Sequence, residues 1–433
     1  MITLPTLYAR DRKGAIISWT VCAEGDLVVT QHGKLNGKQT THKDRALPTN
    51  TGRANQRLGE AQAEFEAQAA WDKKRKEGYT ESIEQARHQL VLKPMLAHPI
   101  TKSATVKGEK VKIKRTIEFP CSVQRKYNGL RCLAIYANEQ PMFQGFAIGT
   151  VTLRSRECEV WTNLPHIEAH IKMFADRGDI VDGEIYQKGV PLQVLNSRIK
   201  RAQDETRHLQ FFLYDLPSSS GAIDLSWEGR HERLRERYIA YVATHRPVAL
   251  VRDIAQVMAE LDTTSALALY MRSLPLQFVP TWTATDEDQV TRMGLQAIAD
   301  GYEGLILRQS GRNYEFDNRT ESLLKWKQFT DEEFVITDAK SREFFPADGS
   351  PSHLILDKMV CRNNLTDASF EVVPVGTMAE RRDMWENRVQ HLGQFMTVRF
   401  LERSADGLPQ GNPVGYLRLK EDKAAPADGA MWD

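Results

Sequence analysis

Six short segments of this 433-residue chain carry residue types suited to phosphate and nucleotide chemistry. In chain order they are Lys126–Arg131, Asp182–Ile185, Phe211–Leu216, Glu303–Arg308, Leu324–Lys327 and Arg418–Lys423. Each is weak by itself, because a lysine beside a glycine or a charged pair after an apolar run is common in soluble proteins. All six in one fixed order are far rarer by chance. Together they predict a site for nucleotidyl transfer.

Lys126 is the candidate nucleophile. A lysine attacks only after its ammonium loses a proton, and burial or a neighbouring cation promotes that loss by lowering the pKa. Lys126 begins a turn between two strand-like runs, residues 121–124 and 131–135. In that turn Gly129 lets the backbone approach a ligand, and Arg131 offers a rigid fork of donors. A plain β-hairpin turn is the alternative interpretation of this segment taken alone.

Two glutamates and two lysines are candidates to complete the site. Glu184 and Glu303 each adjoin a glycine at the predicted start of a strand, and two carboxylates at a cleft edge suit magnesium or a ribose hydroxyl. Lys325 and Lys327 are two residues apart in a strand-like run, so we expect their side chains on one side of a sheet. Their ammonium groups repel each other unless an anion lies between them, and a triphosphate supplies that charge. The alternative for each of the four is an ordinary surface residue.

Size and composition argue against several classes of protein. With 41% hydrophobic residues the chain is long enough for two or three domains, each with its own core. It has no run of 18 apolar residues and its start lacks the features of a secretory signal, so we expect a soluble, cytoplasmic protein with no membrane partner. Five scattered cysteines without CxxC spacing argue against disulfides and structural zinc. A formal net charge of +1 argues against a general polyanion binder but allows one basic channel.

The patterning predicts an α+β multidomain fold. Short alternating apolar runs within residues 7–42 predict a small antiparallel sheet, and residues 55–76 continue with helical spacing and a stop at Gly78. Strand-like and helical segments then alternate to about residue 329. Beyond it, short β runs interrupted by a helical segment at 378–390 predict a small barrel, and the last ten residues predict a frayed tail.

A basic stretch lies near the start of the middle part. Its cations are Lys102, Lys107, Lys110, Lys112, Lys114 and Arg115. Residues 111–114 alternate between apolar and basic, as an edge strand does. Lysines there either protect a sheet edge from pairing with another chain or contact phosphate, and the sequence favours neither interpretation.

In these segments the chain resembles the covalent nucleotidyltransferase superfamily, and most closely the ATP-dependent DNA ligases of phage or bacterial type. The similarity covers about residues 93–423. It implies a small β-rich N-terminal module at residues 1–90, a nucleotidyltransferase (adenylation) domain of antiparallel sheets with helices at 91–330, and a C-terminal OB-fold β-barrel with a flexible tail at 331–433. It also implies a ligase that seals nicks in DNA replication, repair and recombination.

The resemblance implies a role for each site residue. Lys126 would carry AMP through a phosphoramidate bond, and Lys325 and Lys327 would contact the α-phosphate in catalysis. Further contacts to ATP would come from Arg131, Arg156, Glu184, Tyr214, Glu303, Arg418 and Lys423. Among these, Glu184 would read the ribose and Tyr214 would lie against adenine, while Glu184 and Glu303 would also serve Mg²⁺. The implied cofactors are ATP and Mg²⁺, and the implied partner is nicked double-stranded DNA bound by a monomer.

Three residues depart from the family pattern. Asn128 stands where Asp is usual, Arg308 where Lys is frequent, and Lys420 where Arg is frequent. Asn128 keeps the hydrogen-bonding shape of Asp but loses the charge, so we expect adenylation to survive better than sealing.

Several alternatives stay open. Residues 27–34 resemble a WGR module without its defining Trp-Gly-Arg, so DNA binding and a packing or partner role are both possible for the N-terminal module. Within the superfamily, an mRNA guanylyltransferase and an RNA ligase are the alternatives to a DNA ligase. An alternative of another class is a catalytically silent DNA-binding relative that keeps the fold.

Overall fold

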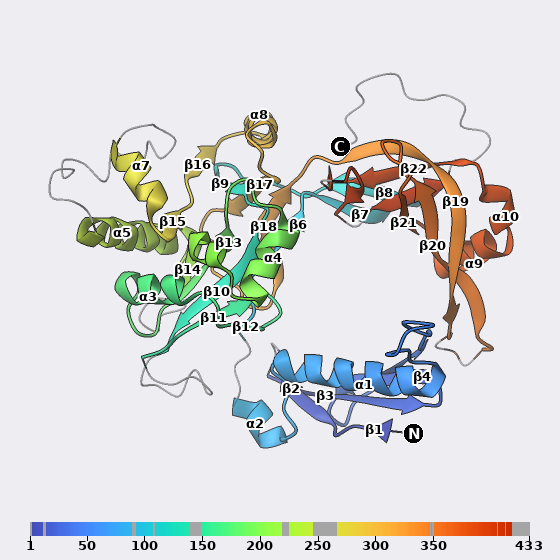
Figure 1. Cartoon of the computed structure of the whole chain (residues 1–433). Coiled ribbons are helices and arrows are strands. Elements are labelled where there is room, and N and C mark those ends of the chain that lie inside the picture. Colours follow the sequence, from blue (N-terminus) through green and yellow to red (C-terminus); the bar gives the residue numbers. More distant parts are fainter. Residues whose placement is uncertain are drawn as a thin grey trace. The chain divides into compact units, whose positions relative to one another are not determined.

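The computed structural model of the protein describes most of the chain (Figure 1). The described residues are 2–11, 14–88, 92–106, 109–137, 149–218, 225–245, 266–346, 348, 350–404, 406–411 and 413–417. At residue 88, at residues 102–106 and at residues 109–113 the structure describes the backbone alone. The chain divides into two compact units: one holds residues 76–327 with 9–14, and the other holds residues 1–8, 15–75 and 328–432.

The N-terminal part is an antiparallel sheet with a helix. Its strands are β1 (Ile2–Thr3), β2 (Leu7–Arg10), β3 (Ile16–Glu24), β4 (Leu27–Lys34) and β5 (Gln39–Arg45). Helix α1 (Gly59–Lys76) follows, and α2 (Ile83–His88) comes after it. Trp71 of α1 donates its indole N–H to the carbonyl of Pro5 at 2.8 Å, which ties the helix to the start of the sheet. The predicted small sheet is confirmed, and the predicted helix begins at Gly59 rather than Asn55.

The middle unit is built on two sheets. The larger has six strands in the order β12-β11-β10-β13-β14-β15, and the smaller has five in the order β16-β9-β17-β18-β6. The larger contains β10 (Leu130–Tyr136), β11 (Val151–Ser155), β12 (Val160–Trp161), β13 (Ile180–Tyr186), β14 (Gln210–Ser218) and β15 (Leu276–Phe278). The smaller contains β6 (Leu96–Pro99), β9 (Cys121–Lys126), β16 (Thr281–Ala284), β17 (Gly304–Gln309) and β18 (Arg319–Trp326). Strand pairs are antiparallel except β14–β15 and β18–β6.

Helices cover these sheets and bury their apolar residues. They are α3 (Pro165–Phe174), α4 (Leu192–Lys200), the 3-10 helix η2 (Asp204–His208), α5 (Trp227–His245), α7 (Ala266–Ser273) and α8 (Glu287–Ala299). Ile167 of α3 and Tyr238 of α5 pack into the same buried cluster as Leu213 of the six-stranded sheet. A second cluster joins Val290 of α8 to Leu305 of the five-stranded sheet. The two cores hold the strands of both sheets in fixed positions, as a catalytic scaffold requires.

The C-terminal part is a closed barrel. It contains β19 (Thr330–Phe344), β20 (His353–Arg362), β21 (Ser369–Pro374), β22 (Phe395–Phe400) and β25 (Val414–Leu417). Between β21 and β22 lie α9 (Met378–Glu386) and α10 (Arg388–His391), and β23 (Glu402–Arg403) pairs with β24 (Pro409–Gln410). The predicted small barrel with a helical interruption is therefore present. The predicted frayed tail lies outside the described residues.

No helix in the described ranges combines the length and the apolar character needed to cross a membrane.

Candidate active site

Lys126 is the last residue of β9, and the chain after it crosses from one sheet to the other. β9 pairs with β16 and β17 in the five-stranded sheet, whereas β10 pairs with β11 and β13 in the six-stranded sheet. The β-hairpin interpretation of this turn is therefore wrong, because the two flanking strands do not pair with each other. Gly129 is required in the crossing: a Cβ there would lie 2.5 Å from the carbonyl oxygen of Ile185 and 2.6 Å from Cγ of Glu184.

Glu303 joins Lys126 to Lys327. Its Oε2 accepts a hydrogen bond from the ammonium of Lys126, and its Oε1 accepts one from the ammonium of Lys327. The three side chains are 22%, 15% and 12% exposed for Lys126, Glu303 and Lys327. Burial alone would raise the pKa of Glu303, but the two ammonium groups outweigh it and the pKa is lowered. The carboxylate therefore stays ionised between two cations.

Lys325 is the last but one residue of β18, and Lys327 directly follows the last residue of that strand, Trp326. Trp326 between them points toward α8: a Cβ added to Gly294 of α8 would meet its ring at 2.6 Å. Burial, reinforced by the ammonium groups of Lys327 and Lys126, lowers the pKa of Lys325 to about 8. This supports the expectation that the two lysines share one side. The anion beside Lys327 is the protein's own Glu303.

Glu184 lies near the middle of β13, not at the start of a strand as the sequence suggested. The strand begins earlier because Ile180 and Val181 already pair with β10. The Glu184 Oε1 accepts a hydrogen bond from the N–H of Gly129 at 3.2 Å, and its Oε2 accepts one from the Tyr214 hydroxyl at 2.6 Å. Burial raises the pKa of Glu184 against the opposing charge of the Lys126 ammonium. Glu184 is thus fixed against the turn that follows the candidate nucleophile.

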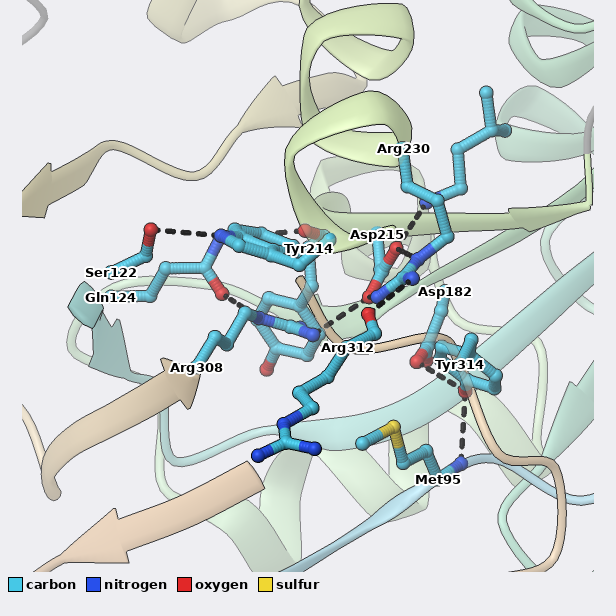
Figure 2. Close-up of polar contacts among 12 residues, drawn as sticks. Met95, Ser122, Gln124, Asp182, Tyr214, Asp215, Arg230, Arg308, Arg312 and Tyr314 are labelled. Carbon is cyan, nitrogen blue, oxygen red and sulfur yellow. Dashed lines mark hydrogen bonds and ion pairs between the residues drawn. The ribbon is translucent and has the colours of Figure 1, made fainter. Parts of the chain in front are cut away.

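Arg131 is held by a buried acid. Its Nε and one terminal nitrogen donate to the two carboxylate oxygens of Asp182, each at 2.5 Å. Asp182 also accepts a hydrogen bond from the Tyr314 hydroxyl at 2.7 Å, and that hydroxyl accepts one from the N–H of Met95 at 2.9 Å (Figure 2). The Arg131 guanidinium lies 5.1 Å from the ring centroid of Tyr214. The donor fork that sequence reasoning assigned to the nucleotide is occupied by Asp182.

A second buried acid, Asp215, binds two arginines, and sequence reasoning missed this network. Arg230 donates to both of its oxygens at 2.7 and 3.2 Å, and Arg308 donates to Oδ2 at 2.7 Å (Figure 2). Arg308 also reaches Gln124 at 2.9 Å, and its guanidinium lies 4.3 Å from the ring centroid of Trp227. A lysine has no planar group that could make these contacts together. This explains why arginine, rather than the lysine frequent in the family, occupies position 308. The sequence did contain a signal, because Asp215 lies inside an apolar strand-like run. A buried acid needs a charged or hydrogen-bonding partner, so such a residue predicts a buried network.

The remaining predicted residues lie elsewhere or outside the described chain. Arg156 follows β11, is 52% exposed and lies 3.5 Å from the carboxylate of Glu157. No contact between Arg156 and the other candidate residues occurs in the described parts of the chain. Arg418, Lys420 and Lys423 lie outside the described residues.

Two carboxylates, those of Glu184 and Glu303, lie near Lys126. Over the described ranges, no group of three or more His, Cys, Asp or Glu side chains forms a metal site. Glu184 and Glu303 are close enough for the charge of Glu303 to raise the pKa of Glu184. Proteins commonly hold Mg²⁺ with one or two carboxylates while substrate phosphates supply further ligands. The pair therefore fits a metal that arrives with a nucleotide.

Comparisons with known proteins agree with this arrangement. A family model described as ATP dependent DNA ligase domain matches residues 94–327, which is more than half of the chain. A DNA ligase of African swine fever virus, isolate Pig/Kenya/KEN-50/1950, is 25% identical over 222 residues, covering 50% of this chain and 43% of the viral protein. The DNA ligase of isolate Warthog/Namibia/Wart80/1980 is 24% identical over the same length. The chain thus matches less than half of the length of these relatives.

A solved structure has a similar fold. The one titled "Pmar-Lig_Pre." has a TM-score of 0.51 and 18% identity, covering 76% of this chain and 66% of that one. At this identity the likeness concerns the fold alone. The family match begins at Pro94 and ends at Lys327. It therefore includes Lys126, Glu184, Glu303 and Lys325. The chain belongs to the ATP-dependent DNA ligase family.

Proposed function

We propose that the protein is an ATP-dependent DNA ligase that seals nicks through an AMP-lysine formed on Lys126. One observation carries the proposal. Lys126 lies at a crossing between two sheets and shares the Glu303 carboxylate with Lys327, beside the buried Glu184 and the partly buried Lys325. Three neighbouring ammonium groups repel each other. A lysine that served only the stability of the fold would therefore not be expected beside two others.

In the first step the amine of Lys126 attacks the α-phosphorus of ATP. A bond forms between Nζ and phosphorus, the bond from that phosphorus to the bridging oxygen breaks, and pyrophosphate leaves. Nζ must first give up a proton, which passes to solvent, while the ionised Glu303 carboxylate accepts a hydrogen bond from Nζ and orients it. Lys325 and Lys327 are positioned to stabilise the negative charge on the phosphates.

Glu184 and Glu303 would hold Mg²⁺ together with the phosphates of ATP. When bound, the ion would neutralise phosphate charge and favour departure of pyrophosphate. Glu184 would also accept a hydrogen bond from a ribose hydroxyl. We assign Tyr214 to orienting Glu184, because its hydroxyl already binds that carboxylate. Contact of the Tyr214 ring with adenine stays a prediction.

Two more displacements would complete the reaction. An oxygen of the 5′-phosphate at a nick attacks the phosphorus of AMP, the bond to Nζ breaks, and Lys126 takes back a proton. The 3′-hydroxyl then attacks the 5′-phosphorus, loses its proton and releases AMP as the phosphodiester forms. Each step leaves charge on phosphate oxygens, which the lysine cluster is suited to stabilise.

We propose the domain division 1–90, 91–330 and 331–433. The closed five-stranded barrel supports an OB-fold assignment for the last domain, since OB-folds are five-stranded barrels. Arg418 and Lys423 would act from that domain on the phosphates of ATP, and Arg156 would contact phosphate from the turn after β11. The N-terminal sheet and α1 support a WGR-like module, whose role is either DNA binding or packing and contact with a partner.

The test is to incubate the protein with magnesium and α-labelled ATP or, separately, GTP. We expect label from ATP alone that stays on the denatured chain, is lost in acid, is absent in Lys126→Ala and is discharged by nicked DNA. Label from GTP would favour an mRNA guanylyltransferase, and sealing of RNA duplexes but not DNA would favour an RNA ligase. No label from either nucleotide would favour the catalytically silent relative and overturn the proposal.

A further inference from the structure

The basic stretch after β6 forms a two-stranded ribbon of its own. β7 (Thr101–Val106) and β8 (Glu109–Lys114) pair antiparallel with each other and, among the described strands, with no other (Figure 1). β8 is therefore no edge of either main sheet. The sequence allowed two interpretations of the lysines in β8, protection of a sheet edge or contact with phosphate. The first does not hold for the edges of the two main sheets.

The register separates the ribbon into two different faces. Directly paired residues of antiparallel strands share a face, and every second residue returns to it. One face combines three lysines with three hydroxyl residues, in the pairs Thr101–Lys114, Ser103–Lys112 and Thr105–Lys110. The other face combines Lys102, Ala104, Val106, Glu109, Val111 and Ile113. The single acidic residue of the two strands, Glu109, thus belongs to the face opposite the three lysines. Of these lysines, Lys114 at the base of the ribbon also forms an exposed ion pair with Glu287 of α8 at 3.4 Å.

The base of the ribbon is bonded to the strand that carries Lys325. The N–H of Arg115 donates to the carbonyl of Ile100 at 2.6 Å, and the N–H of Ile100 donates to the carbonyl of Lys325 at 3.1 Å. Pro99 is the register partner of Lys325 in the β6–β18 pair. The Arg115 side chain secures the same corner through the carbonyl of Pro99 at 3.0 Å. The ribbon therefore starts at the wall of the candidate active site.

We propose that the face bearing Lys110, Lys112 and Lys114 contacts the phosphate backbone of duplex DNA that is engaged at Lys126. This inference rests on the proposed function. Alternate strand residues are about 6.8 Å apart, so the three lysines span about 14 Å. One strand of B-DNA presents a phosphate about every 3.4 Å along its axis, so several phosphates fall within that span. Hydroxyl side chains also bind phosphate oxygens, and contacts of this kind carry no base sequence information.

The experiment compares full-length wild type with a Lys110→Gln, Lys112→Gln double variant in binding nicked and intact duplex DNA over a range of salt concentrations. Each phosphate contact contributes about 0.9 to the slope of log K against log salt. We expect the double variant to lower that slope by about 2, equally for nicked and intact duplexes. Self-adenylation without DNA should not change, since neither residue contacts the nucleotide in the proposed mechanism.

A charge-matched control uses Lys172→Gln with Lys200→Gln on α3 and α4, where both lysines are exposed. The control should keep the wild-type slope. An unchanged slope in the ribbon variant, an equal fall in the control, or a fall seen on duplex RNA but not on DNA would overturn the inference. Failure of the wild type to self-adenylate would contradict the proposed function instead, and the salt dependence would still report on the ribbon.

Discussion

Glu303 is tied to Lys126 twice. Its backbone N–H donates to the carbonyl of Lys126 at 3.0 Å, and its carboxylate accepts a hydrogen bond from the ammonium of the same residue. The backbone tie fixes the start of β17 against the end of β9, so the carboxylate is positioned by the sheet itself. A site built on paired strands in this way keeps its geometry better than one built on loops alone.

Replacing Glu303 with Gln should therefore damage adenylation more than folding. The amide keeps the shape but removes the charge between Lys126 and Lys327, so the two lysines repel each other and Lys126 is no longer held in place. We expect self-adenylation to fall by about 100-fold, the size typical of one preorganised electrostatic contact. Single-turnover labelling measures it. The matched control is Glu232→Gln, an exposed residue of α5 paired with Arg235, and a loss as large in that variant would contradict the role of Glu303.

Lys325 should impose an upper pH limit on nucleotide binding. Its pKa is lowered to about 8, so the ammonium is present below that pH and is lost as the pH rises through it. Loss of this charge weakens attraction to the α-phosphate, so we expect the KM for ATP in self-adenylation to rise above pH about 8. Lys325→Arg keeps a cation at every accessible pH and should flatten this rise. The same rise in KM with arginine at position 325 would assign the titration to another group.

Much of the site could be predicted from local pattern, because Lys126, Glu303 and the Lys325–Lys327 pair each lie in a short strand-and-turn segment. The sheet to which each strand belongs could not. β9 and β10 look like the arms of a hairpin, and only distant partners such as β17 and β13 separate them. The partners of Asp215 were equally hidden, since Arg308 is 93 residues away in the chain. Glu184 was misplaced because Asp182–Gly183 resembles a turn before a strand, whereas the turn that precedes β13 contains Gly178, two residues before Ile180.

The Asp215 network should act on stability. Asp215 is fully buried and its pKa is lowered: burial alone would raise it, but the charges of Arg230 and Arg308 outweigh that effect. Asp215→Asn would leave two buried arginines without their counterion, which typically costs about 3–5 kcal/mol. Urea unfolding measures the loss. Asp331→Asn, which breaks the partly exposed pair with Arg399, should cost about 1 kcal/mol or less. Equal losses of stability in both variants would show that the buried Asp215 network contributes no more than the partly exposed Asp331–Arg399 pair.

Asn128 offers a test of which chemical steps depend on the residue at position 128. It lies two residues after Lys126 in the turn that crosses between the sheets, so Asn128→Asp adds a carboxylate beside the nucleophile without changing shape. A carboxylate there can bind a metal or accept a proton from the 3′-hydroxyl, whereas the amide can do neither as well.

We therefore expect Asn128→Asp to speed sealing of a pre-adenylated nick by about 10-fold or more, within the range of general base catalysis, while self-adenylation changes little. Single-turnover assays of the two steps on the same preparation measure both rates. An equal gain in both steps would mean that the added charge acts on Lys126 itself. No change in either step would show that the amide at position 128 already serves this protein as well as a carboxylate does.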